Sequence, residues 1–206
     1  MTLSRRLLGV VVLLLAYLAL GLTVTRFPIA ELDRGEQLFA GRSVGLALFF
    51  TTSGTFVVYA ILCALTFLVG VLRRGWFPST LAIVGTFLCA WFSSDLFKEL
   101  FRRARPEHWY GLHETSFAYS SGHATLSLVF YGLWAYLLWR SFPPAPWRTA
   151  LIALLACWAV AIGWSRLALG AHYPTDLLGG YLLGAIWLLL GMSAIDRLAG
   201  RQETAT

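Results

Sequence analysis

The chain has 206 residues, of which 58% are hydrophobic and 13% are charged, and its formal net charge is +6. Soluble domains carry about 25% charged residues, so the composition excludes an ordinary water-soluble globule. The positive charge comes without a basic run or a soluble module, which argues against nucleic acid as a partner. Anchoring at a membrane surface and an anionic substrate explain the charge better.

Six apolar segments follow one another along the chain. A spanning helix needs roughly 20 mostly apolar residues, and each segment is close to that length or longer. We therefore expect an all-α fold, an integral membrane bundle of six transmembrane helices, as a single domain over residues 1–206. The sequence does not indicate an oligomeric state. The segments are Leu7–Thr25, Val44–Leu72, Gly75–Ser94, Ser120–Trp139, Thr149–Ser165 and Leu177–Ile195.

Three of these segments have individual features. Leu7–Thr25 lacks a clear small-x-small cleavage site, so we interpret it as a retained first helix rather than a signal peptide. Val44–Leu72 is longer than one span requires, and its first third is expected to lie along the interface or to belong to a tilted helix. In the last segment, Gly180 and Gly184 predict close packing of helices within the chain.

The arginines near the segment ends indicate an orientation. They stand in pairs in every second connection, as the positive-inside rule expects of cytoplasmic loops. We therefore place the N-terminus inside, which puts the connections after the third and fifth segments together on the outer face. The pairs are Arg5 and Arg6, Arg73 and Arg74, Arg140 and Arg148, and Arg197 and Arg201.

The first polar cluster, Lys98 to Pro106, follows the third segment. On a helix Lys98, Arg102 and Arg105 are four and three residues apart and project from one face. Like charges this close repel one another, and a bound anion would offset that cost. The alternative is anchoring to anionic lipid head groups, which explains Arg102 and Arg103 well.

The second cluster runs from Ser120 through Ser121 and Gly122 to His123, where the fourth segment begins. Serines and a glycine before an apolar helix leave backbone N–H groups free at its N-terminus, which is a ready site for an anion. His123 then lies in the first turn. The alternative is ordinary N-capping by Ser120 or Ser121, with His123 as an interfacial residue.

The third cluster, between the last two segments, contains Arg166, His172 and Asp176. Because His172 and Asp176 are four residues apart, the carboxylate can accept the Nδ1–H of the imidazole in a helical turn, which leaves Nε2 free as a nucleophile or base. Arg166 offers a planar pair of donors to phosphate oxygens. The alternative is a structural His–Asp hydrogen bond that caps the last helix.

Together the three clusters supply the parts of a phosphoryl-transfer site that needs no metal and no cofactor. Three cations would bind the equatorial oxygens of the phosphoryl group, one histidine would attack phosphorus, and the other would protonate the leaving oxygen. The three cysteines lie inside apolar segments and show no metal-ligand spacing. Phosphate esters at the outer membrane face are the natural substrates of such a site.

With these motifs the sequence resembles the type 2 phosphatidic acid phosphatase family, whose pattern is Lys-x6-Arg-Pro, then Pro-Ser-Gly-His, then Ser-Arg-x5-His-x3-Asp. The resemblance covers essentially the whole chain. One departure is a serine in place of the family's proline, which removes a stiffening residue beside the amide donors. The matching stretches are Lys98-x6-Arg105-Pro106, Ser120-Ser121-Gly122-His123 and Ser165-Arg166-x5-His172-x3-Asp176.

The resemblance implies a role for each motif residue. His172 would be the nucleophile that forms a phosphohistidine, and Asp176 would orient it. His123 would be the general acid, and later the base that activates water. The phosphate-binding residues that it implies are Lys98, Arg105, Arg166, Ser121 and Gly122.

The implied activity is hydrolysis of a lipid phosphomonoester or diphosphate, such as undecaprenyl diphosphate, phosphatidylglycerol phosphate or phosphatidic acid. We expect a multi-pass protein of a bacterial cytoplasmic (inner) membrane, in contact with the bilayer and its lipid phosphates, with the site on the outer, periplasmic or extracellular, face. Two alternatives stay open. One is a phosphotransferase that uses the same phosphohistidine, and the other is a non-enzymatic protein that binds or transports lipid phosphates.

Some polar residues near the first cluster have no motif position. We interpret the histidines among them as solvated or interfacial, and the glutamates as loop charges, with one glutamate as a candidate partner of the arginines. These residues are His108, His113, Glu99, Glu107 and Glu114.

Overall fold

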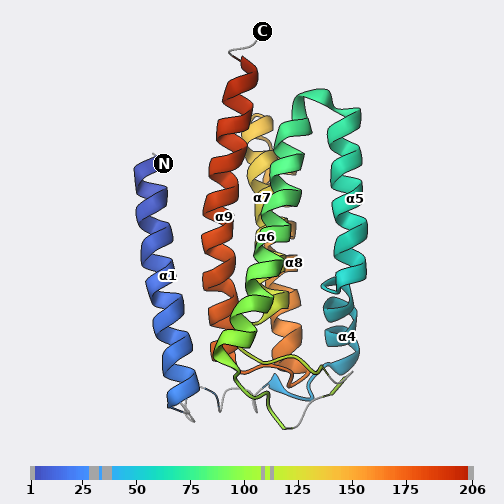
Figure 1. Ribbon diagram of the computed structural model, residues 1–206. Helices are drawn as coiled ribbons and strands as arrows, with labels where there is room; N and C mark the ends of the chain where they lie inside the picture. The colour runs from blue at the N-terminus through green and yellow to red at the C-terminus, as the bar shows by residue number, and fades with distance from the viewer. Residues whose placement is uncertain (1–2, 28–32, 34–38, 108–109, 112–113, 204–206) are drawn as a thin grey trace.

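The computed structural model describes residues 3–27, 33, 39–107, 110–111 and 114–203, and within these ranges the regular structure is helical, without strands. The helices run side by side as one bundle (Figure 1). The predicted all-α fold is confirmed. The elements are α1 (Leu3–Arg26), α4 (Val44–Ser53), α5 (Phe56–Leu72), a short 3₁₀ turn η1 (Arg74–Trp76), α6 (Phe77–Phe101), α7 (Gly122–Ser141), α8 (Pro146–Ala168) and α9 (Pro174–Glu203).

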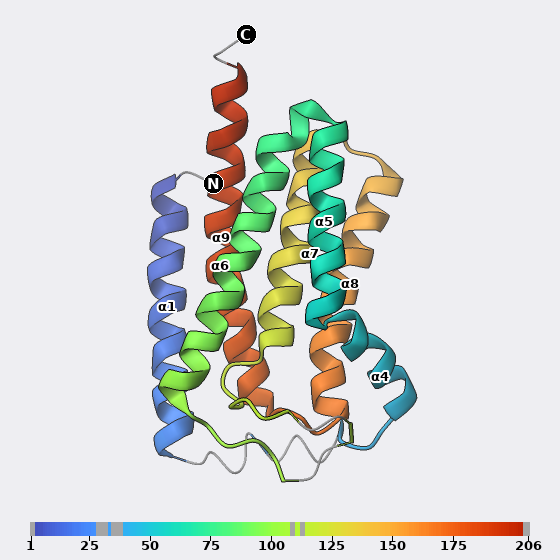
Figure 2. The ribbon, with the colours of Figure 1, turned by 45° about the vertical axis from the view of Figure 1, so that its right-hand side comes forward.

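Helix α7 is the central element, and α6, α8 and α9 all pack against it. Helix α1 packs mainly against α9, on the side away from α5, and α4 packs against α8 (Figures 1 and 2). The loops after α6 and α8 meet at one end of the bundle, which we call the loop end, where the Tyr110 N–H donates to the Leu169 carbonyl over 2.7 Å. The prediction that these two connections share one end is therefore confirmed.

Four helices are long and apolar enough to cross a membrane: α1, α6 together with η1, α8, and α9 as far as Leu198. Helices α4 and α5 make a fifth if they are counted as one bent span. Helix α7 has a lower mean hydropathy because polar side chains such as His123, Thr125 and Ser127 interrupt its apolar sequence. The six predicted segments are thus all helical, while four or five of them qualify as spans among the described residues.

The long second segment is broken rather than straight. Helix α4 ends at Ser53 and α5 begins at Phe56, and the two axes differ by 45°. Helix α4 covers the first third of that segment and is bent away from the axis of α5, while its expected position along the interface stays a prediction. A Cβ added to Gly54 at the break would lie 2.7 Å from Cδ2 of His123. The glycine therefore lets the chain turn directly beside the first turn of α7.

The buried core lies between α6, α7 and α9, whereas large apolar side chains of α1 and α5 are exposed around the outside. Exposed apolar faces of this extent are typical of surfaces that meet a partner or a membrane. The core side chains include Ile83, Leu133, Leu137 and Ile195, and the exposed ones include Leu8, Leu15, Phe56, Val57 and Leu72.

The two glycines of α9 face α7 at close range. A Cβ on Gly180 would lie 2.6 Å from the carbonyl oxygen of Ser121, and a Cβ on Gly184 would lie 3.0 Å from that of Thr125. The predicted close packing within the chain is confirmed. It brings the start of α9 and the start of α7 together at the loop end.

Helix α1 is docked at two levels. Tyr119 Oη donates to the Tyr17 carbonyl over 2.8 Å, and the Tyr17 and Ser120 hydroxyls lie 3.2 Å apart. Near the opposite end of the bundle, Arg6 Nη1 donates to Asp196 of α9 over 2.7 Å. Helix α1 therefore contacts both the last helix and the segment that leads into α7.

Candidate active site

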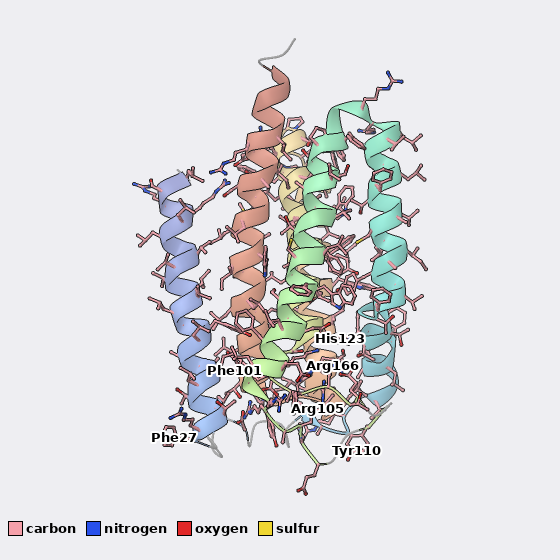
Figure 3. All side chains as sticks on the ribbon, in the orientation of Figure 1. Phe27, Phe101, Arg105, Tyr110, His123 and Arg166 are labelled. Atoms are coloured by element: carbon pink, nitrogen blue, oxygen red, sulfur yellow. The ribbon has the colours of Figure 1, made fainter. Side chains whose placement is uncertain are left out.

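The three polar clusters of the sequence come together at the loop end of the bundle. Lys98 lies in the last turn of α6, His123 in the first turn of α7 and Arg166 in the last turn of α8. Arg105 and His172 belong to the two loops that meet there. Figure 3 shows Arg105, Arg166 and His123 gathered at this end. Residues far apart in the sequence thus form one site.

Arg105 lies against the expected nucleophile. Its Nη1 is 3.2 Å from His172 Nε2 and donates to the Ala171 carbonyl over 2.9 Å. Because a guanidinium has donors only, Nε2 is the accepting nitrogen and the proton of the neutral ring is on Nδ1. Burial, with Arg105 and Arg166 nearby, lowers the pKa of His172 well below its ordinary value. The imidazole is therefore neutral at neutral pH.

Glu114 connects the two arginines of this site. Arg105 Nη2 donates to Glu114 Oε2 over 2.7 Å, and Arg166 Nη2 donates to Glu114 Oε1. Burial opposes ionisation of Glu114, but Arg166 and Arg105 outweigh it and lower the pKa of this carboxyl. The expectation that a loop glutamate pairs with the arginine cluster is confirmed, and that glutamate bridges two motif arginines.

The pairing of His172 with Asp176 is close but is not a hydrogen bond. His172 Nδ1 lies 3.5 Å from Asp176 Oδ2, and Nδ1 has no hydrogen-bond partner in the described part of the chain. Asp176 Oδ2 instead accepts the Tyr173 N–H over 2.9 Å. The predicted Nδ1–H bond is therefore wrong for this geometry, although the carboxylate does face the imidazole. Both side chains are almost wholly buried.

Arg103 is a member of the site that the sequence interpretation assigned to the membrane surface. Its Nη1 donates to Asp176 Oδ1 over 2.5 Å and to Thr175 Oγ1 over 2.7 Å. Its Nη2 donates to Asp33 Oδ2 over 2.5 Å. Arg103 is thus a buried cation between two carboxylates, and the surface assignment is wrong for this residue.

The end of α6 explains why Arg102 and Arg103 differ. The helix stops at Phe101, and Arg102 adopts left-handed backbone angles, φ 48° and ψ 37°. The chain therefore leaves the helical path before Arg105, and the predicted common helical face of Lys98, Arg102 and Arg105 is wrong. Arg102 remains outside, with its side chain 70% exposed beside Glu99.

The start of α7 has no side-chain cap. Ser121 is the N-cap residue but makes no capping hydrogen bond, and the Ser120 hydroxyl contacts Tyr17 instead. Ordinary N-capping by these serines is therefore not observed. A Cβ added to Gly122 would lie 3.5 Å from Lys98 Nζ, so the lysine ammonium lies close to this helix N-terminus.

A cavity of about 370 Å³ opens at this site. One end is polar and includes Lys98, Glu114 and His123, while the other end is apolar and lies between α5 and α6. The cavity therefore has two chemically distinct ends. The apolar wall includes Phe56, Tyr59, Phe87, Trp91 and Leu126.

Among the described residues, four polar atoms of the predicted motif residues are buried without a hydrogen-bond partner. They are Ser121 Oγ, His123 Nε2, Arg166 Nε and His172 Nδ1. A buried polar atom left without a partner costs about 1–3 kcal/mol, and each such atom in a native protein calls for a specific explanation. An anion with several oxygens would provide partners for the donors among them.

Other expectations concern the periphery of the site. His108 and His113 lie outside the described residues, Glu99 pairs with Arg102 over 3.6 Å, and Glu107 is exposed. Among the residues that the structure describes, no group of three or more histidine, cysteine, aspartate or glutamate side chains is arranged to hold a metal ion.

Comparison with known proteins gives consistent matches. The PAP2 superfamily model matches residues 76–199. Phosphatidylglycerophosphatase B of Bacillus subtilis (strain 168) is 35% identical over 98 residues, covering 47% of this chain and 48% of the relative. Lipid A 1-phosphatase of Rhizobium johnstonii is 34% identical over 107 residues, covering 47% and 40%. The putative undecaprenyl-diphosphatase YbjG of Escherichia coli K12 is 34% identical over 94 residues, covering 42% and 43%.

The chain spans less than half the length of each of these three relatives. A longer match is found with a solved structure, the first transmembrane PAP2 type phosphatidylglycerolphosphate phosphatase from Bacillus subtilis. The two structures superpose with a TM-score of 0.79 at 23% sequence identity, over 92% of this chain and 97% of the other. The helical arrangement described above is therefore a known membrane-protein fold.

Proposed function

The chain belongs to the PAP2 superfamily, whose model matches residues 76–199, and from this premise we propose that it is an integral membrane lipid phosphatase. The proposed substrate is undecaprenyl diphosphate, phosphatidylglycerol phosphate or phosphatidic acid. The observation that carries the proposal is the group of unpartnered buried polar atoms at the place where buried cations surround His172. A phosphate group offers oxygens that can accept from the donors among these atoms.

In the first proposed step, His172 Nε2 attacks phosphorus while the bond from phosphorus to the lipid oxygen breaks. His123 donates a proton to that leaving oxygen, which is worth about 10²–10⁴-fold in rate for a well-placed acid. Lys98, Arg105 and Arg166 bind the three other oxygens, where donors fixed in advance stabilise the transition state.

In the second step, water attacks the phosphohistidine, the bond between phosphorus and Nε2 breaks, and His123 accepts the proton of the water. Ser121 and the Gly122 backbone support the phosphate oxygens. Asp176 faces Nδ1 and stabilises the positive imidazole that forms during transfer. Besides water, the proposed reaction uses side chains and backbone groups of this protein, without a metal ion or cofactor.

Glu114 has a part in this proposal before substrate binds. Its carboxylate already accepts hydrogen bonds from Arg105 and Arg166, the arginines assigned to the phosphate. The substrate phosphate would replace that carboxylate, so that these arginines pass from one anion to another and are never left buried without a counter-charge.

The apolar end of the cavity supports a lipid rather than a soluble phosphate as substrate. Phe56 packs on Trp91 and Tyr59 packs on Phe87, with ring centroids 5.1 and 5.0 Å apart, and these rings of α5 and α6 line the cavity. They would contact the first part of the lipid chain. In the proposed topology α7 is the sixth span, and its lower hydropathy is acceptable because three neighbouring helices surround it. The site lies on the outer face of a bacterial cytoplasmic membrane.

The proposal is tested by phosphate release from a panel of lipid phosphates in detergent. We expect release from at least one lipid, unchanged by chelators, and its loss in His172→Ala. Activity that survives this substitution would contradict the nucleophile assignment. Arg105→Gln should raise KM, while the exposed neighbour Arg102→Gln should behave like the parent protein.

The same experiment separates the two alternatives. Transfer of the phosphoryl group to an added alcohol or lipid, with little free phosphate, would favour a phosphotransferase. Binding of lipid phosphates without turnover by the parent protein would favour a binding or transport protein. A phosphorylated intermediate on His172, labile in acid and stable in base, would exclude the latter.

A further inference from the structure

Arg103 is a buried cation that the proposed reaction does not use. It follows α6 in the loop end and is 9% exposed. Its hydrogen bonds go to Asp176, Thr175 and Asp33, and its guanidinium lies 4.5 Å from the centre of the Tyr173 ring. Three of these four residues, Tyr173, Thr175 and Asp176, lie within four positions after His172 in the sequence.

The carboxylate of Asp176 is fixed by contacts to both oxygens. Oδ1 accepts from Arg103 over 2.5 Å, and Oδ2 accepts the backbone N–H of Tyr173 over 2.9 Å. Oδ2 is also the atom that lies 3.5 Å from His172 Nδ1. Because Asp176 is wholly buried, its charge needs a cation inside the protein, and among the described arginines and lysines Arg103 is in direct contact with it.

Asp33 holds Arg103 from the other side. Its Oδ2 accepts from Arg103 over 2.5 Å, and its Oδ1 accepts from the Thr175 hydroxyl over 2.8 Å. Thr175 also accepts from Arg103, so Arg103, Asp33 and Thr175 form a closed ring of hydrogen bonds. The ring leaves the guanidinium little freedom to turn away from Asp176.

We propose that Arg103 is a positioning residue, held by Asp33, that keeps the Asp176 carboxylate charged and turned toward His172 Nδ1. This inference rests on the proposed function, in which His172 is the nucleophile. Arg103 acts through Asp176, since its own hydrogen bonds are made to Asp33, Thr175 and Asp176. Its loss should therefore slow phosphoryl transfer and leave phosphate binding largely intact.

The simpler explanation is that Arg103 only ties the segment before α4 to the start of α9. Stability measurements alone would not separate the two, because breaking a buried ion pair destabilises a protein in either case. The two explanations differ in their effects on kcat and KM, because a positioning role predicts a lower kcat with a nearly unchanged KM. A purely structural role predicts that activity follows the folded fraction.

The central variant is Arg103→Gln, and Arg102→Gln is its matched control, with the same change one residue earlier on an exposed side chain. We expect Arg103→Gln to lower kcat by about 10- to 100-fold, by analogy with the loss seen when a partner that orients a metal-binding histidine is removed. KM and the inhibition constant of inorganic phosphate should change by less than about 3-fold. Arg103→Lys should recover part of kcat, because one ammonium can still reach Asp176.

A second variant covers the case in which Arg103→Gln does not fold. The double variant Arg103→Gln with Asp33→Asn removes one cation together with one anion, so that Asp176 is the one charge of the three that remains. It should show the same loss of kcat, whereas Asp33→Asn alone should lose less. Normal kcat in either folded variant that lacks Arg103 would overturn the proposal.

Vanadate gives a readout without turnover. Vanadate can bond to an imidazole nitrogen and take five-coordinate geometry, whereas phosphate only pairs with the cations. We expect calorimetry to show weaker vanadate binding in Arg103→Gln, with phosphate binding unchanged. Equal loss of both ligands would contradict a positioning role. If His172→Ala binds vanadate as tightly as the parent protein, the nucleophile assignment fails and this inference fails with it. If His172→Ala binds vanadate more weakly but Arg103→Gln binds it like the parent protein, only the inference about Arg103 fails.

Discussion

Replacing Glu114 by glutamine tests whether this carboxylate holds the place of the substrate phosphate. Glu114 receives hydrogen bonds from Arg105 and Arg166, one on each oxygen. An amide can accept from one arginine, but its NH₂ group opposes the donors of the other. The Glu114→Gln protein should therefore lose at least one charge-assisted contact and bind inorganic phosphate more tightly than the parent.

The magnitude follows from those contacts. A hydrogen bond to a charged group contributes about 1.5–3 kcal/mol, and the lower end applies here because the Glu114 side chain is 31% exposed. Since about 1.4 kcal/mol corresponds to a tenfold change in binding, the dissociation constant of inorganic phosphate should fall roughly tenfold. Without phosphate, the protein should be less stable than the parent, because two buried arginines lose their anion.

Calorimetric titration with phosphate and thermal unfolding in detergent measure both effects. The increase in Tm caused by phosphate should be larger in Glu114→Gln than in the parent, because a ligand that binds the folded state more tightly stabilises it more. Glu107→Gln, an exposed change in the same loop, should behave like the parent. Weaker phosphate binding in Glu114→Gln would refute the argument and would show that Glu114 orients the arginines instead of competing for them.

Three further predictions concern other parts of the molecule. The lowered pKa of His172 keeps its imidazole neutral as the pH falls through about 6.5, the ordinary pKa of histidine. We therefore expect kcat/KM to decline only at lower pH. A decline of kcat/KM that begins at or above about pH 6.5 would contradict this. Gly54→Ala would place a Cβ 2.7 Å from the His123 ring and displace it. We expect kcat to fall by up to about 100-fold, the loss that a shift of about 1 Å in a catalytic group can cause. Gly45→Ala, which has open space around it, should leave kcat unchanged. Arg6→Gln should lower the free energy of unfolding by about 1–3 kcal/mol, because Asp196 of α9 loses its contact with the guanidinium. KM should not change. An unchanged Tm would count against a stabilising role of that contact.

The helices and their common end were predictable because both follow from local chemistry. Apolar segments of spanning length locate the helices. Because successive helices run in opposite directions across the bundle, every second connection lies at the same end. The break between Ser53 and Phe56 could be anticipated only as excess length, since no charge or proline marks it. The centrality of α7 was not predictable either, because it depends on packing among helices distant in sequence.

The sequence predicted which residues come together at the candidate site, but not the contacts that they make there. Motif spacing identified His172 and Arg105, which the structure brings within 3.2 Å. Arg103 was missed because the helical spacing rule fails at Arg102, where the backbone turns left-handed. Glu114 bridges the arginines across a loop whose path no pattern encodes. In both cases the information lies in tertiary contacts.

The docking of α1 sets an order for the assembly of the protein. Helix α1 precedes its main packing partner, α9, by all the other helices of the described bundle, so α1 is synthesised well before α9. Tyr17 of α1 contacts Tyr119 and Ser120, the residues that lead into the first turn of α7. Until α9 has packed against α1 and α7, the segment that leads into α7 lacks its full support, so phosphate-binding capacity should appear only after translation of α9 is complete.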